Sequence, residues 1–298
     1  MQALWMILAS LLFALMGVGI KFSATSFNVA ELVFYRGIVS LVFTLALMRA
    51  SRVSWRTRVP EMHLWRTVVG TLSLGAWFYA ITYLPLATAM TLNYMSSIWM
   101  AVFIVGGALI YGQPLRQGPL VLTILAAFVG VVMLLRPTLA DQQWFAGLVG
   151  LLSGIGAALA YMQVTALARV GEPAIRTVFY FAWGTAAAGA TGMALMGITP
   201  WQQVSTAAAL WLVPIGVLAS LGQWCMTRAY SHGATLVAAN WQYSGIVFAA
   251  LFGMLLFGDV ISPLGWAGMA LIIASGIAAT LLRAKAVPDA PQSAAESS

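Results

Sequence analysis

Charged residues are scarce in this sequence. Only 7% of its 298 residues are Asp, Glu, Lys or Arg, whereas 62% are hydrophobic. A soluble domain carries about 25% charged residues, so the composition excludes an ordinary soluble globular protein and predicts a polytopic membrane protein. The net charge of +7 is therefore expected to lie in loops beside the membrane, and we expect no nucleic-acid partner.

Residues that carry common chemistry are few as well. Cys225 is the single cysteine, which excludes an internal disulfide. His63 and His232 lie far apart without a ligand cluster, so we expect no metal site. Neither Lys21 nor Lys285 belongs to a Gly-Lys-Ser/Thr motif, which excludes a Walker loop and direct ATP coupling. With no Ser/His pair or paired Asp inside an apolar segment, we expect neither an enzyme nor a cofactor.

What the sequence has in abundance is apolar segments near the roughly 20 residues that span a membrane. Short polar, Gly or Pro-containing breaks separate them, so consecutive helices are expected to form tight hairpins. The tail at 284–298 is small and polar, and we expect it to be disordered and cytoplasmic. The ten predicted spans are approximately 3–22, 29–49, 64–84, 87–110, 115–135, 144–167, 173–196, 208–228, 233–257 and 263–283.

The distribution of Lys and Arg predicts the orientation of these spans. Cytoplasmic loops of membrane proteins carry an excess of both residues. With both termini on one side, that side holds far more of them than the other, which holds Lys21 and Arg136. We therefore expect a multi-pass membrane protein with cytoplasmic termini. The residues assigned to the cytoplasmic loops are Arg49, Arg52, Arg56, Arg58, Arg66, Arg116, Arg169, Arg176, Arg228, Arg283 and Lys285.

The two halves of the chain share a weak repeat. Tyr83-x-x-x-Ala87-Thr88 in the first half matches Tyr230-x-x-x-Ala234-Thr235 in the second, and Gly112-Gln113 with Gly130 matches Gly258-Asp259 with Gly276. Each half holds five predicted spans. Because five is odd, the second half would be inverted relative to the first, as in many transporters. We predict one repeat at 1–137 and the other at 138–283.

Matching polar patches interrupt two of the apolar segments. In 87–103 the patch includes Asn93 and Ser97, and in 234–251 it includes Asn240 and Ser244. Residues four apart share one face of a helix. Two such patches predict a substrate site near the midplane, where the repeats meet; the alternative is that they only hold helices together. On a regular helix Gln242 points about 160° away from Asn240 and Ser244, so it faces another helix or the helix is distorted.

Arg36 and a set of aromatic residues complete the candidate site. A charged residue inside a span is costly and indicates function, and Arg36 could attract a substrate carboxylate; the alternative is an Arg that caps carbonyls or reaches the surface. Tyr and Trp at mid-membrane depth suit a flat amphipathic substrate, although such residues can also serve packing. The candidate substrate-binding residues are Arg36, Trp77, Tyr79, Tyr83, Asn93, Tyr94, Ser97, Trp99, Tyr161, Trp224, Asn240, Gln242, Tyr243 and Ser244.

Several motifs together give a family resemblance. They are Glu31-Leu-Val-Phe-Tyr-Arg36, the two Tyr-x-x-x-Ala-Thr hairpins, Gly258-Asp259 and Leu271-Ile-Ile-Ala-Ser-Gly276. On these residues the chain resembles the drug/metabolite transporter superfamily, and within it the EamA-type exporters. The resemblance implies an all-α fold of ten transmembrane helices, in two inverted five-helix repeats around a central cavity. It also implies a location in the bacterial inner membrane and export of a substrate such as Phe, Tyr, Trp or a similar metabolite.

The predicted mechanism is alternating access. No Asp or Glu lies deep in a predicted span, so the usual proton relay is missing and facilitated export, a uniport, is expected. The alternative is efflux of drugs or other metabolites, coupled to protons through an unidentified group. Gly150-Leu-Leu-Ser-Gly154 is a GxxxG motif, which we interpret as close packing within one chain. A monomer in the lipid bilayer is expected, with a homodimer left open.

Overall fold

The computed structural model describes residues 2–84, 86–111, 118–135, 144–231, 235–258 and 262–286. Within these ranges the chain is α-helical with one short 3-10 helix and contains no strand, which confirms the all-α prediction. The predicted tail and the turns at 112–117, 136–143 and 259–261 lie largely or wholly outside the described residues. The elements are α1 Gln2–Ser23, α2 Val29–Ala50, α3 Pro60–Tyr83, α4 Leu86–Tyr94, α5 Ser96–Ile110, α6 Gly118–Leu135, α7 Trp144–Arg169, α8 Ala174–Met196, η1 Trp201–Gln203, α9 Thr206–Ser231, α10 Thr235–Gln242, α11 Ser244–Phe257 and α12 Pro263–Ala286.

Two predicted spans are each divided into two helices. The span expected at 87–110 breaks at Met95, between α4 and α5, and the one expected at 233–257 breaks at Tyr243, between α10 and α11. At each break a backbone N–H bonds three residues back, as from Ile98 to Met95 and from Ile246 to Tyr243. Both breaks fall inside the polar patches. The break at Met95 was not predicted, whereas a distortion near Gln242 was one of the two predicted alternatives and is present at Tyr243.

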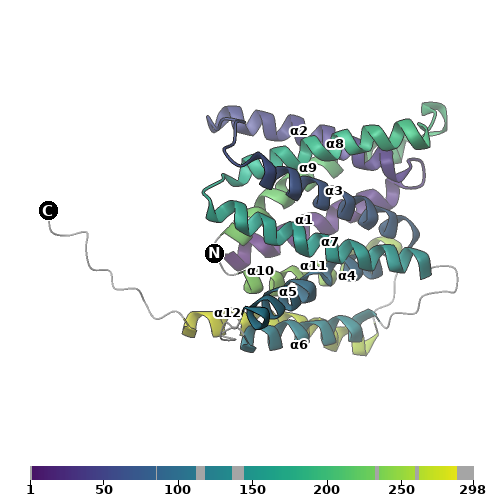
Figure 1. Ribbon diagram of the computed structural model, residues 1–298. Coiled ribbons are helices and arrows are strands. Elements are labelled where there is room, and N and C mark those ends of the chain that lie inside the picture. Colours follow the sequence, from purple (N-terminus) through teal and green to yellow (C-terminus); the bar gives the residue numbers. More distant parts are fainter. Residues whose placement is uncertain are drawn as a thin grey trace.

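The helices pack as pairs that join the two halves of the chain. Helix α1 lies along α9, α2 along α8, α3 along α7 and α6 along α12. In Figure 1 the α2–α8 pair forms one edge of the bundle and the α6–α12 pair the opposite edge. The interrupted helices lie between them, with α4 against α11 and α5 against α10. The centre of the bundle is therefore surrounded by helices from both halves.

Apolar side chains cover much of the bundle surface. Leu72, Val42, Leu210 and Leu255 are all exposed, which fits a surface that faces lipid rather than water. By length and composition alone, five helices could cross a membrane, and they comprise α1, α2, α7, α9 and the segment that joins α10 to α11. Shorter apolar helices lie within 88–104, 118–133 and 263–279.

The GxxxG motif packs inside the chain, as predicted. A Cβ on Gly154 would lie 2.6 Å from the carbonyl oxygen of Leu92, and one on Gly150 would lie 3.0 Å from the Leu92 side chain. Both glycines therefore let α7 approach the interrupted helix α4. This close approach holds α7 next to the polar patch that contains Asn93.

Candidate functional site

A small cavity lies at the centre of the bundle and is lined by helices from both halves. Its open volume is about 30 Å³, which leaves room for about one water molecule. Two arginines, two amides and several aromatic rings border it, and none of the acidic residues in the described ranges does. The lining residues are Phe13, Arg36, Arg66, Gly70, Ser73, Leu74, Trp77, Asn93, Tyr94, Ala157, Ala160, Tyr161, Phe181 and Gln223.

Arg36 on α2 is buried and has no counter-ion among the residues that the structure describes. The side chain is 1% exposed, so it does not reach the surface. Its Nε and Nη1 atoms have no hydrogen-bond partner among the described residues, so they cap no carbonyl there. The guanidinium carbon lies 5.2 Å from the centre of the Phe181 ring. Glu31 on the same helix is occupied elsewhere, as described below, which leaves the Arg36 charge without an acidic partner.

Arg66 on α3 is a second buried arginine of the central cavity. It is 2% exposed, its Nη2 donates to Gln223 Oε1 at 3.2 Å, and its guanidinium carbon lies 3.9 Å from the Phe181 ring centre. Its Nε and Nη1 atoms have no partner in the described part of the chain. The assignment of Arg66 to a cytoplasmic loop is therefore wrong. Helix α3 begins at Pro60, a favoured first position, and this signal places Arg66 well inside the helix.

Four other predicted site residues line the same cavity: Trp77, Asn93, Tyr94 and Tyr161. Asn93 Nδ2 donates to Ser153 Oγ at 3.0 Å, which orients its amide. Trp77 Nε1 and the Tyr94 hydroxyl are buried without a partner among the described atoms. Buried donors of this kind are costly unless something bonds to them, so they are available to a ligand.

Ser97 of the first patch and several polar residues of the second patch form hydrogen bonds between helices. Ser97 Oγ donates to the Ala239 carbonyl at 2.7 Å, and Asn240 Nδ2 donates to Thr123 Oγ1 at 2.9 Å. Gln242 accepts a bond from the Tyr230 hydroxyl at 2.9 Å. Ser244 bonds to the Trp241 carbonyl beside the break, and Tyr243 is fully buried at the break itself. None of these five predicted site residues lines the central cavity.

The remaining predicted aromatics lie farther out. Trp224 packs edge-on against Trp5, with Arg228 over its ring at 4.7 Å. Trp99 lies against Phe103. Tyr79 and Tyr83 contact each other with ring centres 4.5 Å apart, and both line a second cavity rather than the central one.

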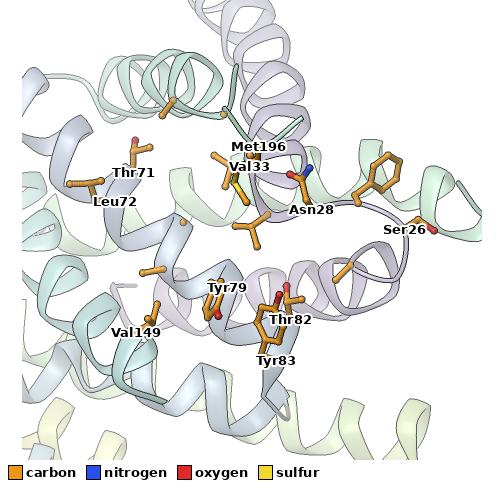
Figure 2. A pocket seen from close by; sticks show the side chains of 18 of the residues that line it. Ser26, Asn28, Val33, Thr71, Leu72, Tyr79, Thr82, Tyr83, Val149 and Met196 are labelled. Atoms are coloured by element: carbon orange, nitrogen blue, oxygen red, sulfur yellow. The ribbon is translucent and has the colours of Figure 1, made fainter. Parts of the chain in front are cut away.

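That second cavity, of about 800 Å³, opens at the end of the bundle where Asn28 lies, here called the Asn28 end. Figure 2 shows Tyr79, Thr82 and Tyr83 on one wall and Val33, Met196 and Asn28 across from them. A cavity of about 520 Å³, lined in part by Trp65 and Arg169, lies toward the opposite end, here called the Glu172 end. Neither shares a lining residue with the central cavity.

A buried glutamate secures the Asn28 end. Glu31 forms a capping box with Asn28 at the start of α2, a pattern that stabilises a helix N-terminus. Its carboxylate also accepts bonds from the Thr199 N–H at 2.8 Å and the Thr199 hydroxyl at 2.7 Å. Glu31, Asn28 and Thr199 form what we call the Glu31 cluster. It joins the start of α2 to the segment after α8 with donors that carry no formal charge.

A second glutamate secures the opposite end. Glu172 accepts a bond from the Thr57 hydroxyl at 2.7 Å, pairs with Arg176 at 2.9 Å and lies 3.2 Å from His63 Nε2. These residues form the Glu172 cluster, which joins the segment before α3 to the start of α8. His63 also stacks on Tyr180 with ring centres 4.4 Å apart. Both titratable residues of this cluster lie outside the predicted spans.

The environment of the Glu172 cluster shifts both of its titratable groups. Burial lowers the pKa of His63, and its hydrogen bond to Glu172 offsets this only in part. Burial tends to raise the pKa of Glu172, but hydrogen bonds from Thr57, Arg176 and His63 outweigh it and the pKa is lowered. At neutral pH the cluster therefore contains an ionised carboxylate, a neutral imidazole and a guanidinium.

Known proteins resemble this chain along nearly its whole length. Residues 1–136 match the EamA-like transporter family. The chain is 34% identical over 279 residues to the pseudopaline exporter CntI of Pseudomonas aeruginosa, covering 91% of this chain and 93% of that protein. It is 27% identical over 279 residues to a riboflavin transporter of Rhizobium johnstonii, covering 92% of this chain and 89% of that protein. A crystal structure at 20% identity has the same fold, with a TM-score of 0.77 over 94% of this chain and 98% of the other.

Proposed function

Because the chain belongs to the EamA-like transporter family, we propose that it exports small metabolites that carry a carboxylate beside a flat or apolar part, aromatic amino acids among them. The observation that carries this proposal is Arg36, a buried cation without an acidic partner in a cavity that also contains Trp77 and Tyr94. An arginine binds a carboxylate through two parallel N–H bonds, and the rings suit the apolar part. The names of the relatives, a pseudopaline exporter and a riboflavin transporter, leave aromatic amino acids as one possibility among small metabolites.

We further propose that transport proceeds by alternating access of two inverted repeats, 1–137 and 138–283. The pairing of α1 with α9 and of α3 with α7 supports this arrangement. In the proposed repeat α1 corresponds to α7 and α3 to α9, so each of these two pairs corresponds to the other. The breaks at Met95 and Tyr243 support it as well, because interrupted helices are typical of transporter sites. The Glu31 and Glu172 clusters lie at opposite ends, where closures on alternate sides would be needed.

The proposed orientation places the Glu172 end in the cytoplasm, together with both termini. Arginines concentrate at that end of the described helices, and an excess of positive charge marks cytoplasmic loops. The cavity of about 800 Å³ at the Asn28 end would then face outward. The arginines concerned are Arg49, Arg52, Arg56, Arg58, Arg169, Arg176 and Arg228.

We propose facilitated export down a concentration gradient, because no carboxylate in the described part of the chain lines the central cavity and a proton carrier there would need one. Proton-coupled efflux of cationic drugs is the alternative. A cavity with two arginines and no acid disfavours a cationic cargo, since the ligand would add to buried positive charge.

Counterflow in proteoliposomes tests the proposal. Labelled Phe, Trp, Met and Thr are offered to the purified protein with and without an imposed proton gradient. Asn93→Ala, in the central cavity, and Asn240→Ala, bonded to Thr123 outside it, form a matched pair. We expect flux of carboxylate-bearing aromatics without a gradient, and a greater loss in Asn93→Ala. Flux that requires the gradient would contradict uniport, and an equal loss in both variants would contradict the placement of the site.

A further inference from the structure

We infer that the central cavity is built for a small dianion, a dicarboxylate or a phosphate monoester, whose two charges are held by Arg36 and Arg66. This inference rests on the proposed transport function and specifies its substrate class. It depends on the second arginine, which a site for a zwitterionic amino acid would not need.

The two arginines form one unit. Both guanidinium groups lie against the ring of Phe181, at 5.2 Å for Arg36 and 3.9 Å for Arg66. Both side chains are at least 98% buried, since they are 1% and 2% exposed. Four of their nitrogen atoms, Nε and Nη1 of each, have no hydrogen-bond partner among the described residues. The two arginines come from helices α2 and α3, and both line the central cavity.

The protein offers no counter-charge for this pair in the described part of the chain. Its three described acidic residues are Glu31, Glu61 and Glu172, and none of them lines the cavity. Glu31 is bonded to Asn28 and Thr199, and Glu172 to Thr57 and Arg176. Two buried like charges repel each other and are expensive without compensation. A monoanion would neutralise one of them, whereas a dianion neutralises both.

The aromatic residues of the cavity indicate what else the ligand contains besides its charges. Phe13, Trp77, Tyr94 and Phe181 present aromatic surface, so an apolar group attached to the dianion would be bound as well. The present open volume of about 30 Å³ is too small for such a molecule. The substrate therefore has to enter while the surrounding helices are farther apart, as alternating access requires.

A pair of probes that differ by one carboxylate tests the inference. Benzylsuccinate carries two carboxylates, and 4-phenylbutyrate is the same skeleton with one removed. Binding to the purified full chain is measured by titration calorimetry in detergent at neutral pH. We expect benzylsuccinate to bind at least about tenfold more tightly, since one added charge-assisted contact is worth about that factor. Equal affinities, together with no binding of phenyl phosphate, would overturn the inference.

The arginine variants assign the preference to the two side chains. Arg36→Gln and Arg66→Gln should each bring the affinity ratio close to one. Arg49→Gln is the matched control, because it removes the same charge from an exposed position on the helix of Arg36 and should keep the ratio. Arg36→Lys and Arg66→Lys keep the charge if a Gln variant fails to fold, and should lower the ratio in part. If both Arg36→Gln and Arg66→Gln still bind benzylsuccinate more tightly than 4-phenylbutyrate by the wild-type ratio, the inference is contradicted.

Gly70 provides a test that keeps both charges. A Cβ at this position would collide with Arg66 Nη1, so Gly70→Ala should displace the guanidinium and lower the ratio severalfold. Gly75→Ala is the control on the same helix, because a Cβ there meets no atom within 4 Å. An unchanged ratio in Gly70→Ala would contradict the placement of Arg66 as a ligand-holding group.

Two further comparisons separate the possible outcomes. Phenyl phosphate distinguishes the sources of the dianion: tight, arginine-dependent binding of it supports the inference, and binding of neither dianion overturns it. Counterflow of labelled benzylsuccinate separates the inference from the proposed function. Selective binding without flux would refute export of this class but leave the dianion site standing. Flux of amino acids without dianion preference would do the reverse.

Discussion

The two ends of the bundle use the same acceptor in different electrostatic settings. Glu31 at the Asn28 end and Glu172 at the Glu172 end each accept a bond from a threonine of the other half of the chain, Thr199 and Thr57 respectively. Glu31 is surrounded by backbone and hydroxyl donors, whereas Glu172 also pairs with Arg176 and His63. At both ends a glutamate–threonine hydrogen bond therefore joins the two halves of the chain, but only Glu172 also has an arginine and a histidine as partners.

This difference indicates how each end would respond to change. The Glu31 cluster depends on hydrogen-bond direction, because backbone N–H groups approach both of its oxygens. The Glu172 cluster depends on charge and on protonation, because its partners include a guanidinium and an imidazole. A substitution that reverses hydrogen-bond direction but keeps side-chain volume should therefore affect the two clusters differently. A change of pH should do so as well.

The largest expected contrast is between Glu31→Gln and Glu172→Gln. At Glu31 either orientation of the amide directs an NH₂ at a backbone N–H, from Asn28 or from Thr199. This should lower the free energy of unfolding by about 1–3 kcal/mol. At Glu172 the NH₂ can face the Thr57 hydroxyl while the amide oxygen accepts from Arg176, so we expect a loss below about 1 kcal/mol. Thermal unfolding in detergent measures both, and equal losses would remove the distinction.

The matched tyrosines of the two hairpins give a second contrast. Tyr230 is fully buried and donates to Gln242 Oε1 at 2.9 Å, while Tyr83 is 56% exposed and lines the cavity at the Asn28 end. Tyr230→Phe should cost about 1–2 kcal/mol because it leaves a buried amide oxygen without its donor. Tyr83→Phe should cost a few tenths of a kcal/mol. Comparable losses of unfolding free energy in the two variants would contradict the expected difference between the buried and the exposed tyrosine.

The smallest expected effect is a dependence on pH at the Glu172 end. Burial lowers the pKa of His63 below 6.5, so the unfolded chain takes up this proton first. The resulting stability is complete above about pH 6.5 and is lost as the pH falls toward the folded pKa. The lowered pKa of Glu172 acts in the same direction below pH 4.5. His63→Gln should therefore lose less thermal stability than the wild type between pH 7.5 and 5.5.

A parallel measurement on Glu31→Gln provides the control for that experiment. This variant keeps His63 and Glu172, so its loss of stability between the two pH values should equal that of the wild type. A pH response that persists in His63→Gln would show that another group titrates in this range.

Most of the helices were predictable because a membrane imposes length and apolarity on each of them. The span expected at 29–49 is α2 at Val29–Ala50, and the one expected at 144–167 is α7 at Trp144–Arg169. Arg66 was assigned to the cytoplasmic side although the predicted span at 64–84 contains it, because it lies close to the start of that span. The helix itself begins earlier, at Pro60, and this places Arg66 deeper. The break at Met95 was missed because a short polar patch is compatible with a continuous helix, whereas the unusual direction of Gln242 already indicated a distortion next to Tyr243.

The sequence predicted the chemical character of the candidate site, but only some of the residues that line it. Intramembrane Arg36 and mid-membrane aromatics indicated a polar cavity, and Arg36, Trp77, Asn93, Tyr94 and Tyr161 do line one. Periodicity alone does not tell which neighbour a helix face will meet. The matched asparagines therefore separate in the structure: Asn93 borders the cavity, whereas Asn240 bonds to Thr123.

By itself the sequence determined a helical membrane protein, the approximate extent of its spans and the presence of an arginine within one of them. These properties follow from local composition, since each span has to satisfy the bilayer on its own. Only the tertiary structure decided that Arg36 and Arg66 share the ring of Phe181 and that two glutamates join the halves at opposite ends. Such contacts join residues more than a hundred positions apart, and their existence depends on how the helices pack together.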